Sequence, residues 1–368
     1  MPKTLLFTGG GTSGHLLPLL TVLSEVERLA PEVRCVYVGS RSDISSTLLD
    51  QHPALERVES FSGKLHRYPT LKQVGEIVRL GRGLAQADQL VRKISPDVVF
   101  AKGGAITVPI VLAAARQHRV IFSHESDVRA GLANRIAARF ATTVFTSYPP
   151  ENYPQLNQKK LQFTGQPVRP EFFQQSNDSP IIDGYRVPKG LPSVLVLGGS
   201  QGAHQLNALV SEQWAVLLAK CSVIHQSGSR DYQQLAQQAA GLPEALRKRL
   251  LLIPFIGSEM AAFMQSAALV VSRSGGTVAE LAASGAAALL IPLPTSAQNH
   301  QWANAEVFRR AGAAMVIDET GLTSATLAHE VLAALDDPSR LATLREQIHG
   351  FAKPDATHTI AQTLIAAL

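Results

Sequence analysis

The stretch Thr4–Pro18, TLLFTGGGTSGHLLP, decides the fold of the chain. Its apolar start, Leu5–Thr8, predicts a short buried strand, and the glycines that follow predict a tight turn. A helix comes next, because apolar side chains recur at helical spacing from Leu16 to Leu29. We expect Pro18 in the first turn of this helix, where its missing N–H costs nothing.

A strand, a glycine turn and a helix N-terminus together form an anion site, which predicts a phosphate or diphosphate ligand. Gly9-x-Gly11-x-x-Gly14 matches the dinucleotide fingerprint, but that motif needs an acidic residue roughly 20 positions on, and Asp43 comes late. The spacing also fits a phosphate-binding P-loop, but His15 stands where lysine is required. A loop for a sugar-nucleotide diphosphate, with His15 facing the reaction, and a plain tight turn remain as alternatives.

Composition predicts a soluble globular α/β protein. The 368 residues suffice for two domains, and 45% hydrophobic with 17% charged residues does not suggest disorder. A net charge of +5 suits nucleic acid, anionic membrane or phosphorylated substrates without choosing among them. Cys35 and Cys221 are expected as reduced core residues of a cytosolic protein. We find no signal peptide and no apolar run of ~18 residues, so we expect any membrane contact to be peripheral.

Strands and helices alternate along the first half, which predicts a mostly parallel sheet covered on both faces. Strands are expected at Leu5–Thr8, Cys35–Val38, Asp97–Ala101, Val120–Ser123 and Thr143–Thr146. A second glycine turn, Lys102–Ala105, precedes the helical run Val108–Arg116, and the polar cluster Ser123–Asp127 ends a strand. Because the carboxyl ends of parallel strands line the ligand crevice, these polar residues are site candidates.

The second half repeats this pattern, which predicts two similar Rossmann-like halves. Gln155–Pro192 is rich in Pro, Gln, Asn and Ser, and we expect an N-terminal domain at 1–160, a linker at 161–192 and a C-terminal domain at 193–368. This leaves open that the last helix packs back on the N-terminal domain. The expected elements are a strand at Ser193–Leu197, a turn at Gly198–Ala203, a helix at Leu206–Leu218, strands at Ser222–His225, Leu250–Pro254, Leu269–Ser272, Ala288–Pro292 and Ala314–Ile317, and a helical tail from Ser324.

Gly198-x-Ser200-x-Gly202 also fits the nucleophile elbow of α/β-hydrolases. A hydrolase would need a later acid and histidine, for example Asp318 with His329 or His358. This hypothesis leaves the first glycine loop and the whole first half without a role.

The stretch Ser272–Glu280 is a second nucleotide-binding candidate, because it follows a strand and opens a helix. Glu280 can accept hydrogen bonds from both ribose hydroxyls, or it can be a solvated acid that complements the helix dipole. Gln301 and Asn304 can bind sugar hydroxyls, or serve as helix caps. No Asp-x-Asp pair and no zinc spacing of Cys or His occurs, which favours holding a diphosphate by backbone N–H groups.

With these motifs in place, the chain resembles the MurG family of peptidoglycan N-acetylglucosaminyltransferases. The resemblance covers nearly the whole length and rests on ordered motifs: GGGTSGHLLP, HESD followed by GLANR, GQPVR, GGSQGA, SRSGGTVAE and NHQWANA. It implies two Rossmann-like domains of the GT-B type with mostly parallel sheets facing a cleft. It also implies inverting transfer of GlcNAc from UDP-GlcNAc to the MurNAc C4 hydroxyl of undecaprenyl-linked lipid I, giving lipid II, with no metal or other cofactor and no nucleic-acid partner.

The resemblance also implies roles for individual residues. His15 is the first candidate for the general base and Glu125 the second, and Arg169 and the loop N–H groups would stabilise the leaving UDP. Ile256 would meet uracil through its backbone, Glu280 the ribose and Gln301 the GlcNAc. The further substrate-binding residues are Thr12, Ser13, Gly14, Asp127, Asn134, Ser200, Gln201, Gly276, Thr277 and Asn304. Relatives often carry Asn at position 127 and Gly at 13, and the 273–280 segment is one residue shorter than usual, which affects the Thr277 contact.

Other classes of protein fit part of this evidence. A related GT-B enzyme could act on another lipid or a small aglycone, and lipid I against diacylglycerol would separate the two. A non-enzymatic nucleotide-sugar binding module would leave His15 and Glu125 without purpose. An NAD-dependent enzyme would bind a nicotinamide cofactor in a fluorescence titration.

The segment Lys64–Lys93 interleaves basic and apolar residues, and it is either an amphipathic helix with a solvated face or a surface for anionic lipid on the inner face of the cell membrane. If it binds lipid, replacing Arg79 and Arg82 by Glu should weaken binding to anionic vesicles, because two attractive charges become repulsive. Vesicle co-sedimentation measures this, and unchanged binding would remove the membrane role.

Overall fold

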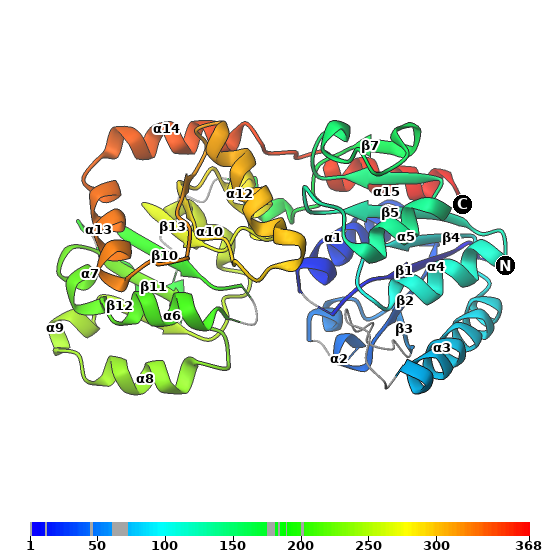
Figure 1. The fold of residues 1–368 in the computed structure, drawn as a ribbon, viewed down its shortest axis with the longest axis horizontal. Coiled ribbons are helices and arrows are strands. Elements are labelled where there is room, and N and C mark those ends of the chain that lie inside the picture. The colour runs from blue at the N-terminus through cyan, green and yellow to red at the C-terminus, as the bar shows by residue number, and fades with distance from the viewer. Residues whose placement is uncertain are drawn as a thin grey trace. The chain divides into compact units, whose positions relative to one another are not determined.

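A computed structural model describes residues 2–11, 13–44, 47–60, 73–174, 181–182, 185–188, 190–199 and 202–368, with the backbone only at 13, 73–82 and 186. The chain forms two compact units. Unit 1 comprises Met1–Arg169 and Lys353–Leu368, and unit 2 comprises Pro170–Ala352. Each unit is a Rossmann-like α/β fold built on a parallel sheet (Figure 1).

Unit 1 is built on a seven-stranded sheet in the order β3-β2-β1-β4-β5-β6-β7, with every pair parallel. All five residues of the central strand β1 are buried, as expected for a strand covered on both faces. The strands are β1 (Thr4–Thr8), β2 (Arg34–Gly39), β3 (Glu56–Glu59), β4 (Val98–Ala101), β5 (Val120–Glu125), β6 (Thr143–Thr146) and β7 (Leu161–Phe163).

The helices of unit 1 cover this sheet, and the last of them closes the core from far along the chain. They are α1 (Ser13–Leu29), α2 (Arg41–Ile44), α3 (Gln73–Ile94), α4 (Thr107–Arg116), α5 (Leu132–Phe140) and α15 (Ala356–Ala366). Helix α15, red in Figure 1, packs on α1, and its Ile360 and Leu364 are fully buried in the unit 1 core. His358 Nδ1 lies 2.7 Å from Glu25 Oε1 of α1.

Unit 2 repeats the design with a six-stranded parallel sheet in the order β12-β11-β10-β13-β14-β15. Its strands are β10 (Ser193–Leu197), β11 (Ser222–Gln226), β12 (Leu250–Ile253), β13 (Leu269–Ser272), β14 (Ala288–Leu290) and β15 (Met315–Val316). Two short strands, β8 (Ile181–Ile182) and β9 (Tyr185–Arg186), pair antiparallel before it. Its helices are α6 (His204–Ser211), α7 (Trp214–Lys220), α8 (Tyr232–Ala240), α9 (Glu244–Arg247), α10 (Met260–Ser266), α11 (Thr277–Ser284), α12 (His300–Arg310), α13 (Ser324–Leu335) and α14 (Pro338–His349).

Three local expectations were wrong. The expected single helix Leu206–Leu218 is two helices, because Gln213 leaves the helical region at φ −111° and Gln238 Nε2 takes the carbonyl of Ser211 at 3.0 Å. Pro18 lies inside α1 and not in its first turn, because the helix already begins at Ser13. Strand β7, in the stretch expected as linker, pairs with β6.

The units also divide the chain at positions other than those expected. Residues 161–169 belong to unit 1 because β7 extends its sheet. Lys353–Leu368 also belongs to unit 1, because the last helix, α15, packs back on this unit, a possibility that the sequence analysis had left open. The segment after Pro170 belongs to unit 2, where Gln265 Nε2 donates to the Phe172 carbonyl at 3.3 Å and the Gln174 carbonyl at 2.6 Å. Cys35 and Cys221 are free and buried, as expected. Among the described residues, no helix has the length and apolarity to cross a membrane.

Because Ile360 is fully buried between α15 and the unit 1 core, Ile360→Ala should lower the free energy of unfolding of unit 1 by about 2–4 kcal/mol. Denaturant unfolding followed by circular dichroism measures the loss. Gln362→Ala, at an exposed position of the same helix, is the matched control and should change stability by less than about 0.5 kcal/mol. Equal effects of the two substitutions would contradict this account of α15.

Candidate functional site

The carboxylate of Asp43 supports the glycine loop that follows β1. Asp43 Oδ1 accepts a hydrogen bond from Gly11 N at 2.8 Å, and its Oδ2 accepts from Ser40 N at 3.1 Å. Tyr37 donates its hydroxyl to the Gly9 carbonyl at 2.6 Å. The Gly11 N–H is therefore already satisfied inside the protein. Asp43, which comes late for a ribose-binding acid, serves as a support for the loop.

The loops after β1 and β4 touch through glycines. A Cβ at Gly104 would lie 2.5 Å from the Gly10 carbonyl oxygen, and the backbone of Gly104 has φ +88°, where side chains are rarely accommodated. A side chain at Gly10 would also clash, because its Cβ would lie 2.5 Å from Asp43 Oδ2. The two glycine turns predicted from the sequence thus lie side by side at the carboxyl end of the sheet.

Glu125 ends β5, and its carboxylate accepts three hydrogen bonds. Its Oε1 accepts from Asp127 N at 2.9 Å, and its Oε2 accepts from Gly131 N at 3.0 Å and Asn134 Nδ2 at 2.8 Å. The residue is only 2% exposed. Burial, and then the charge of Asp127, raise the pKa of Glu125 to about 7, although the three hydrogen bonds act in the opposite direction.

His15 and Asn134 meet over Gly103. A Cβ at Gly103 would lie 3.2 Å from His15 Cε1 and 3.2 Å from Asn134 Oδ1. Asn134 belongs to α5 and His15 to the first turn of α1, so that two helix N-termini converge here. Asn134 Nδ2 also donates to the His124 carbonyl at 3.2 Å. The fold therefore brings together three predicted site residues: His15, Glu125 and Asn134.

A buried lysine lies beside this cluster. Lys102 follows β4, is 0% exposed and donates from Nζ to Ser126 Oγ. Burial lowers the pKa of Lys102 to about 8, while the negative charges of Glu125 and Asp127 oppose that shift. Burial also lowers the pKa of His124 well below its usual range, and its Nε2 lies 3.0 Å from the Gly165 carbonyl oxygen. The carboxyl end of β4 and β5 is thus a dense, buried set of titratable groups.

In unit 2, the side chain of Gln226 links the glycine turn after β10 to the segment after β12. Its Nε2 donates to the Gly199 carbonyl at 3.3 Å, and its Oε1 accepts from Ile256 N at 2.9 Å. The N–H of Ile256 is therefore used inside the protein. Gln226 is the last residue of β11, and a polar residue at the carboxyl end of a buried strand is a signal that sequence reasoning could have used.

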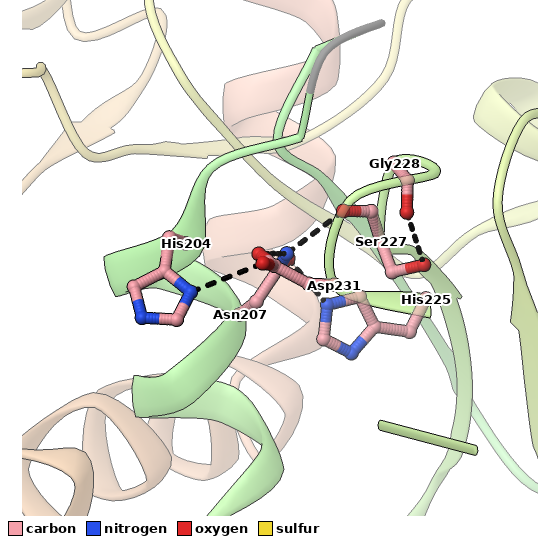
Figure 2. A network of polar contacts seen from close by, with 6 residues as sticks. All are labelled: His204, Asn207, His225, Ser227, Gly228 and Asp231. Atoms are coloured by element: carbon pink, nitrogen blue, oxygen red, sulfur yellow. Dashed lines mark hydrogen bonds and ion pairs between the residues drawn. The ribbon is translucent and has the colours of Figure 1, made fainter. Parts of the chain in front are cut away.

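A polar network centred on Asn207 holds helix α6 against the loop after β11 (Figure 2). Asn207 Nδ2 donates to the Ser227 carbonyl at 2.8 Å and to Asp231 Oδ2 at 2.8 Å, and His225 Nε2 lies 3.0 Å from Asn207 Oδ1. His204 Nδ1 lies 3.1 Å from Asp231 Oδ1. Burial raises the pKa of Asp231, but the hydrogen bonds from Asn207 and His204 outweigh it and bring the pKa below its usual range. None of these residues was predicted.

A third asparagine, Asn304, supports the loop before α11. Its Nδ2 donates to the Ser274 carbonyl at 3.0 Å, and the residue is 1% exposed. Ser274 Oγ in turn donates to the Gln301 carbonyl at 2.8 Å. Gln301 Oε1 accepts from Leu293 N at 2.9 Å, and its Nε2 faces Gly275, where a Cβ would lie 4.0 Å away. Gln301 therefore presents its amide donor at the start of α11, while Asn304 is committed to the loop.

An ion pair fixes the same loop from the other side. Arg273 Nη2 lies 2.6 Å from Glu319 Oε1, and Arg273 Nη1 donates to the Ile291 carbonyl at 2.9 Å. Both side chains are buried. Gly276 then caps α11, Thr277 begins it and Glu280 lies half-buried one turn further on.

The other predicted residues are placed as follows. Gly14 is exposed in α1, Asp127 is half-buried in the turn after β5, and Arg169 is half-buried at the end of the first segment of unit 1. Thr12, Ser200 and Gln201 lie outside the described residues, as do the side chain of Ser13 and most side chains of Lys64–Lys93. In the part of the chain that the structure describes, no group of three His, Cys, Asp or Glu side chains could hold a metal ion.

Comparison with known proteins identifies the family. Residues 5–146 match the glycosyltransferase family 28 N-terminal domain, and residues 193–360 match its C-terminal domain. A protein of Halothermothrix orenii is 32% identical over 97% of this chain and 96% of its own length. One of Lachnospira eligens is 35% identical, over 88% of this chain and 89% of its own. Both are named UDP-N-acetylglucosamine–N-acetylmuramyl-(pentapeptide) pyrophosphoryl-undecaprenol N-acetylglucosamine transferase.

Solved structures share the fold. A crystal structure of Acinetobacter baumannii MurG has a TM-score of 0.73 and 22% identity, covering 99% of this chain and 100% of that one. An S. aureus MnaA–UDP co-structure has a TM-score of 0.70 and 14% identity, covering 97% and 94%. A putative UDP-N-acetylglucosamine 2-epimerase of Listeria monocytogenes has a TM-score of 0.68 and 15% identity, covering 98% and 95%.

Replacing Asn207 by Ala should leave His225 Nε2, the Ser227 carbonyl and Asp231 Oδ2 without this partner in a buried place. We expect a loss of about 2–4 kcal/mol in the unfolding free energy of unit 2, measured by denaturant titration. Gln205→Ala changes an exposed amide of the same helix and should stay within about 0.5 kcal/mol. A small effect of Asn207→Ala would show that the network is dispensable.

Proposed function

The chain belongs to glycosyltransferase family 28, and from this premise we propose that it transfers GlcNAc from UDP-GlcNAc to the C4 hydroxyl of MurNAc in undecaprenyl-linked lipid I, with inversion and without a metal. The product would be lipid II for peptidoglycan synthesis. The proposal is supported most strongly by the activity in the names of the relatives that match along nearly the whole chain. The enzyme is a glycosyltransferase; the donor, acceptor and stereochemistry belong to the proposal.

Unit 2 would hold the donor. Gln301 presents its Nε2 at the start of α11, where a GlcNAc hydroxyl can accept it, and the carbonyl of Ile256 can accept from the uracil N–H. Glu280, one turn inside α11, would accept from the ribose hydroxyls. The loops that carry these groups are fixed by the buried Arg273–Glu319 pair and by Asn304. Because these loops are fixed, the groups that would bind the donor are held in place before the reaction.

Unit 1 would hold the acceptor, and His15 would be its general base. Glu125 has a pKa near neutrality but is 2% exposed and already accepts three hydrogen bonds, which suits it to hold Asn134 in place. His15 is half-buried at the start of α1 beside Asn134. In the proposed step the MurNAc C4 oxygen bonds to the anomeric carbon of GlcNAc, and the bond from that carbon to UDP breaks, with its electron pair leaving on UDP. The proton of the C4 hydroxyl passes to His15.

We place the enzyme in the cytoplasm, peripheral on the inner face of the membrane, because an undecaprenyl acceptor is anchored in lipid. The basic and apolar segment Lys64–Lys93 would provide the attachment.

The deciding experiment is transfer of labelled GlcNAc from UDP-GlcNAc to lipid I by the purified protein. Lipid II should form, and diacylglycerol offered as acceptor should remain unmodified. Because UDP-GlcNAc 2-epimerases share the fold, the same reaction without acceptor is analysed for epimerised UDP-sugar. Epimerisation in place of transfer, or transfer to diacylglycerol alone, would overturn the proposal.

His15→Ala should lower kcat by about 10²–10⁴-fold, because the C4 hydroxyl loses its proton acceptor. Binding of UDP-GlcNAc, measured by calorimetry, should stay nearly intact, since Ile256, Glu280 and Gln301, which would bind the uridine and the sugar, lie in unit 2. His118→Asn, at an exposed histidine with φ +55°, is the control and should keep full activity. Lost donor binding with surviving turnover would make His15 a donor ligand.

A further inference from the structure

Lys102 is the most unusual charged side chain of unit 1. It is 0% exposed, and its ammonium makes one hydrogen bond within the described residues, to Ser126 Oγ. An ammonium has three donors and costs several kcal/mol to remove from water unless opposite charge compensates it. We therefore expect negatively charged groups close to the Lys102 ammonium.

Two carboxylates, at the end of β5 and in the turn after it, supply negative charge near Lys102. Glu125 and Asp127 are the two carboxylates that interact electrostatically with Lys102, and each raises the pKa of the ammonium. They are also close to each other, because the charge of Asp127 raises the pKa of Glu125. The titratable groups that interact with the pair or with its direct neighbours include Lys102, Tyr148 and Tyr153, together with His124 and, through His124, His15. Lys102 is a fully buried amine among them, and its positive charge attracts both carboxylates.

The hydrogen bonds connect Lys102 to the reacting region. Lys102 donates to Ser126 Oγ, and Asp127, the residue after Ser126, donates its N–H to Glu125 Oε1. Glu125 Oε2 accepts from Asn134 Nδ2. Asn134 in turn lies with His15 over Gly103. A change at Lys102 therefore reaches the acceptor side through one short chain of contacts.

We propose that Lys102 is a positioning residue of the transferase: its buried ammonium holds Ser126 by a hydrogen bond and attracts the carboxylates on either side of Ser126, which favours the ionised Glu125 that holds Asn134 beside His15. This inference rests on the proposed function for its kinetic consequences. Lys102 itself need not touch either substrate.

Lys102→Met removes the charge and keeps the side-chain length. The electrostatic attraction between Lys102 and Glu125 is mutual, so we expect its loss to raise the pKa of Glu125 and to protonate this carboxyl at a higher pH. A rise of about one unit in this pKa lowers the ionised fraction of Glu125 at pH 7 from about one half to about one tenth, so we expect kcat at pH 7 to fall about 5-fold with the KM for UDP-GlcNAc unchanged. The acid limb of the kcat profile should move up by about one pH unit, and the basic limb that starts near the lysine pKa of about 8 should disappear.

Lys102→Arg decides the question if the methionine variant does not fold. Arginine stays protonated at every pH used, so the acid limb should stay in place while the basic limb disappears. Lys3→Met is the control, since Lys3 of the same unit is 57% exposed in its pair with Asp97, and its profile should match the wild type. Wild-type kcat and both limbs unchanged in folded Lys102→Met or Lys102→Arg would overturn the proposal.

A measurement without turnover separates this inference from the proposed function. In the full-length protein labelled with carboxyl-¹³C glutamate, the Glu125 signal is identified by its absence in Glu125→Gln. Its titration midpoint should be higher in Lys102→Met than in the wild type and unchanged in Lys3→Met. An equal midpoint overturns the role of Lys102 even if GlcNAc transfer is confirmed. If the Glu125 midpoint is higher in Lys102→Met but the wild-type protein does not transfer GlcNAc, the positioning role of Lys102 is supported and the proposed reaction is rejected.

Discussion

The buried carboxylate of Glu125 is the group on which the organisation of unit 1 at the carboxyl end of its sheet depends. It collects an N–H from the turn that follows β5, an N–H from the start of α5 and the amide of Asn134. A carboxylate in so closed a place is stable only if its hydrogen bonds and nearby charges offset the loss of water. The geometry of the turn, of α5 and of Asn134 beside His15 is therefore a consequence of keeping one acid satisfied.

Both units use buried asparagine side chains to connect helices to neighbouring strand ends and loops. In each case a buried asparagine amide ties the start of a helix to the loop at a strand end: Asn134 in unit 1, and Asn207 and Asn304 in unit 2. A primary amide donates and accepts at once, so it can satisfy backbone groups that would otherwise be stranded between two elements. These amides fix loops, and the residues beside them, such as Gln301, keep groups available for a ligand.

The strands of both sheets were largely predictable, because fully buried parallel strands are continuous apolar runs between glycine turns. The exceptions are informative: β3 alternates charge at a sheet edge, and β7 has three residues inside a polar stretch. The cluster of His15, Glu125 and Asn134 followed from the strand ends and from the family resemblance. Sequence could not reveal the burial of Lys102, since lysine is normally exposed. The pairing of Asn207 with Asp231, 24 residues apart, exists only after folding.

The placement of α15 has a consequence for how this chain folds as it is made. Unit 1 is discontinuous: its first segment ends at Arg169, and α15 joins it only after all of unit 2 has been synthesised. A ribosome that has completed unit 2 has therefore produced a first unit whose α1 still exposes the apolar surface meant for Ile360 and Leu364. The sequential rule of N-terminal domain first is reversed here: unit 2 can complete its core before unit 1 does. During that interval the apolar face of α1 that α15 later buries stays uncovered.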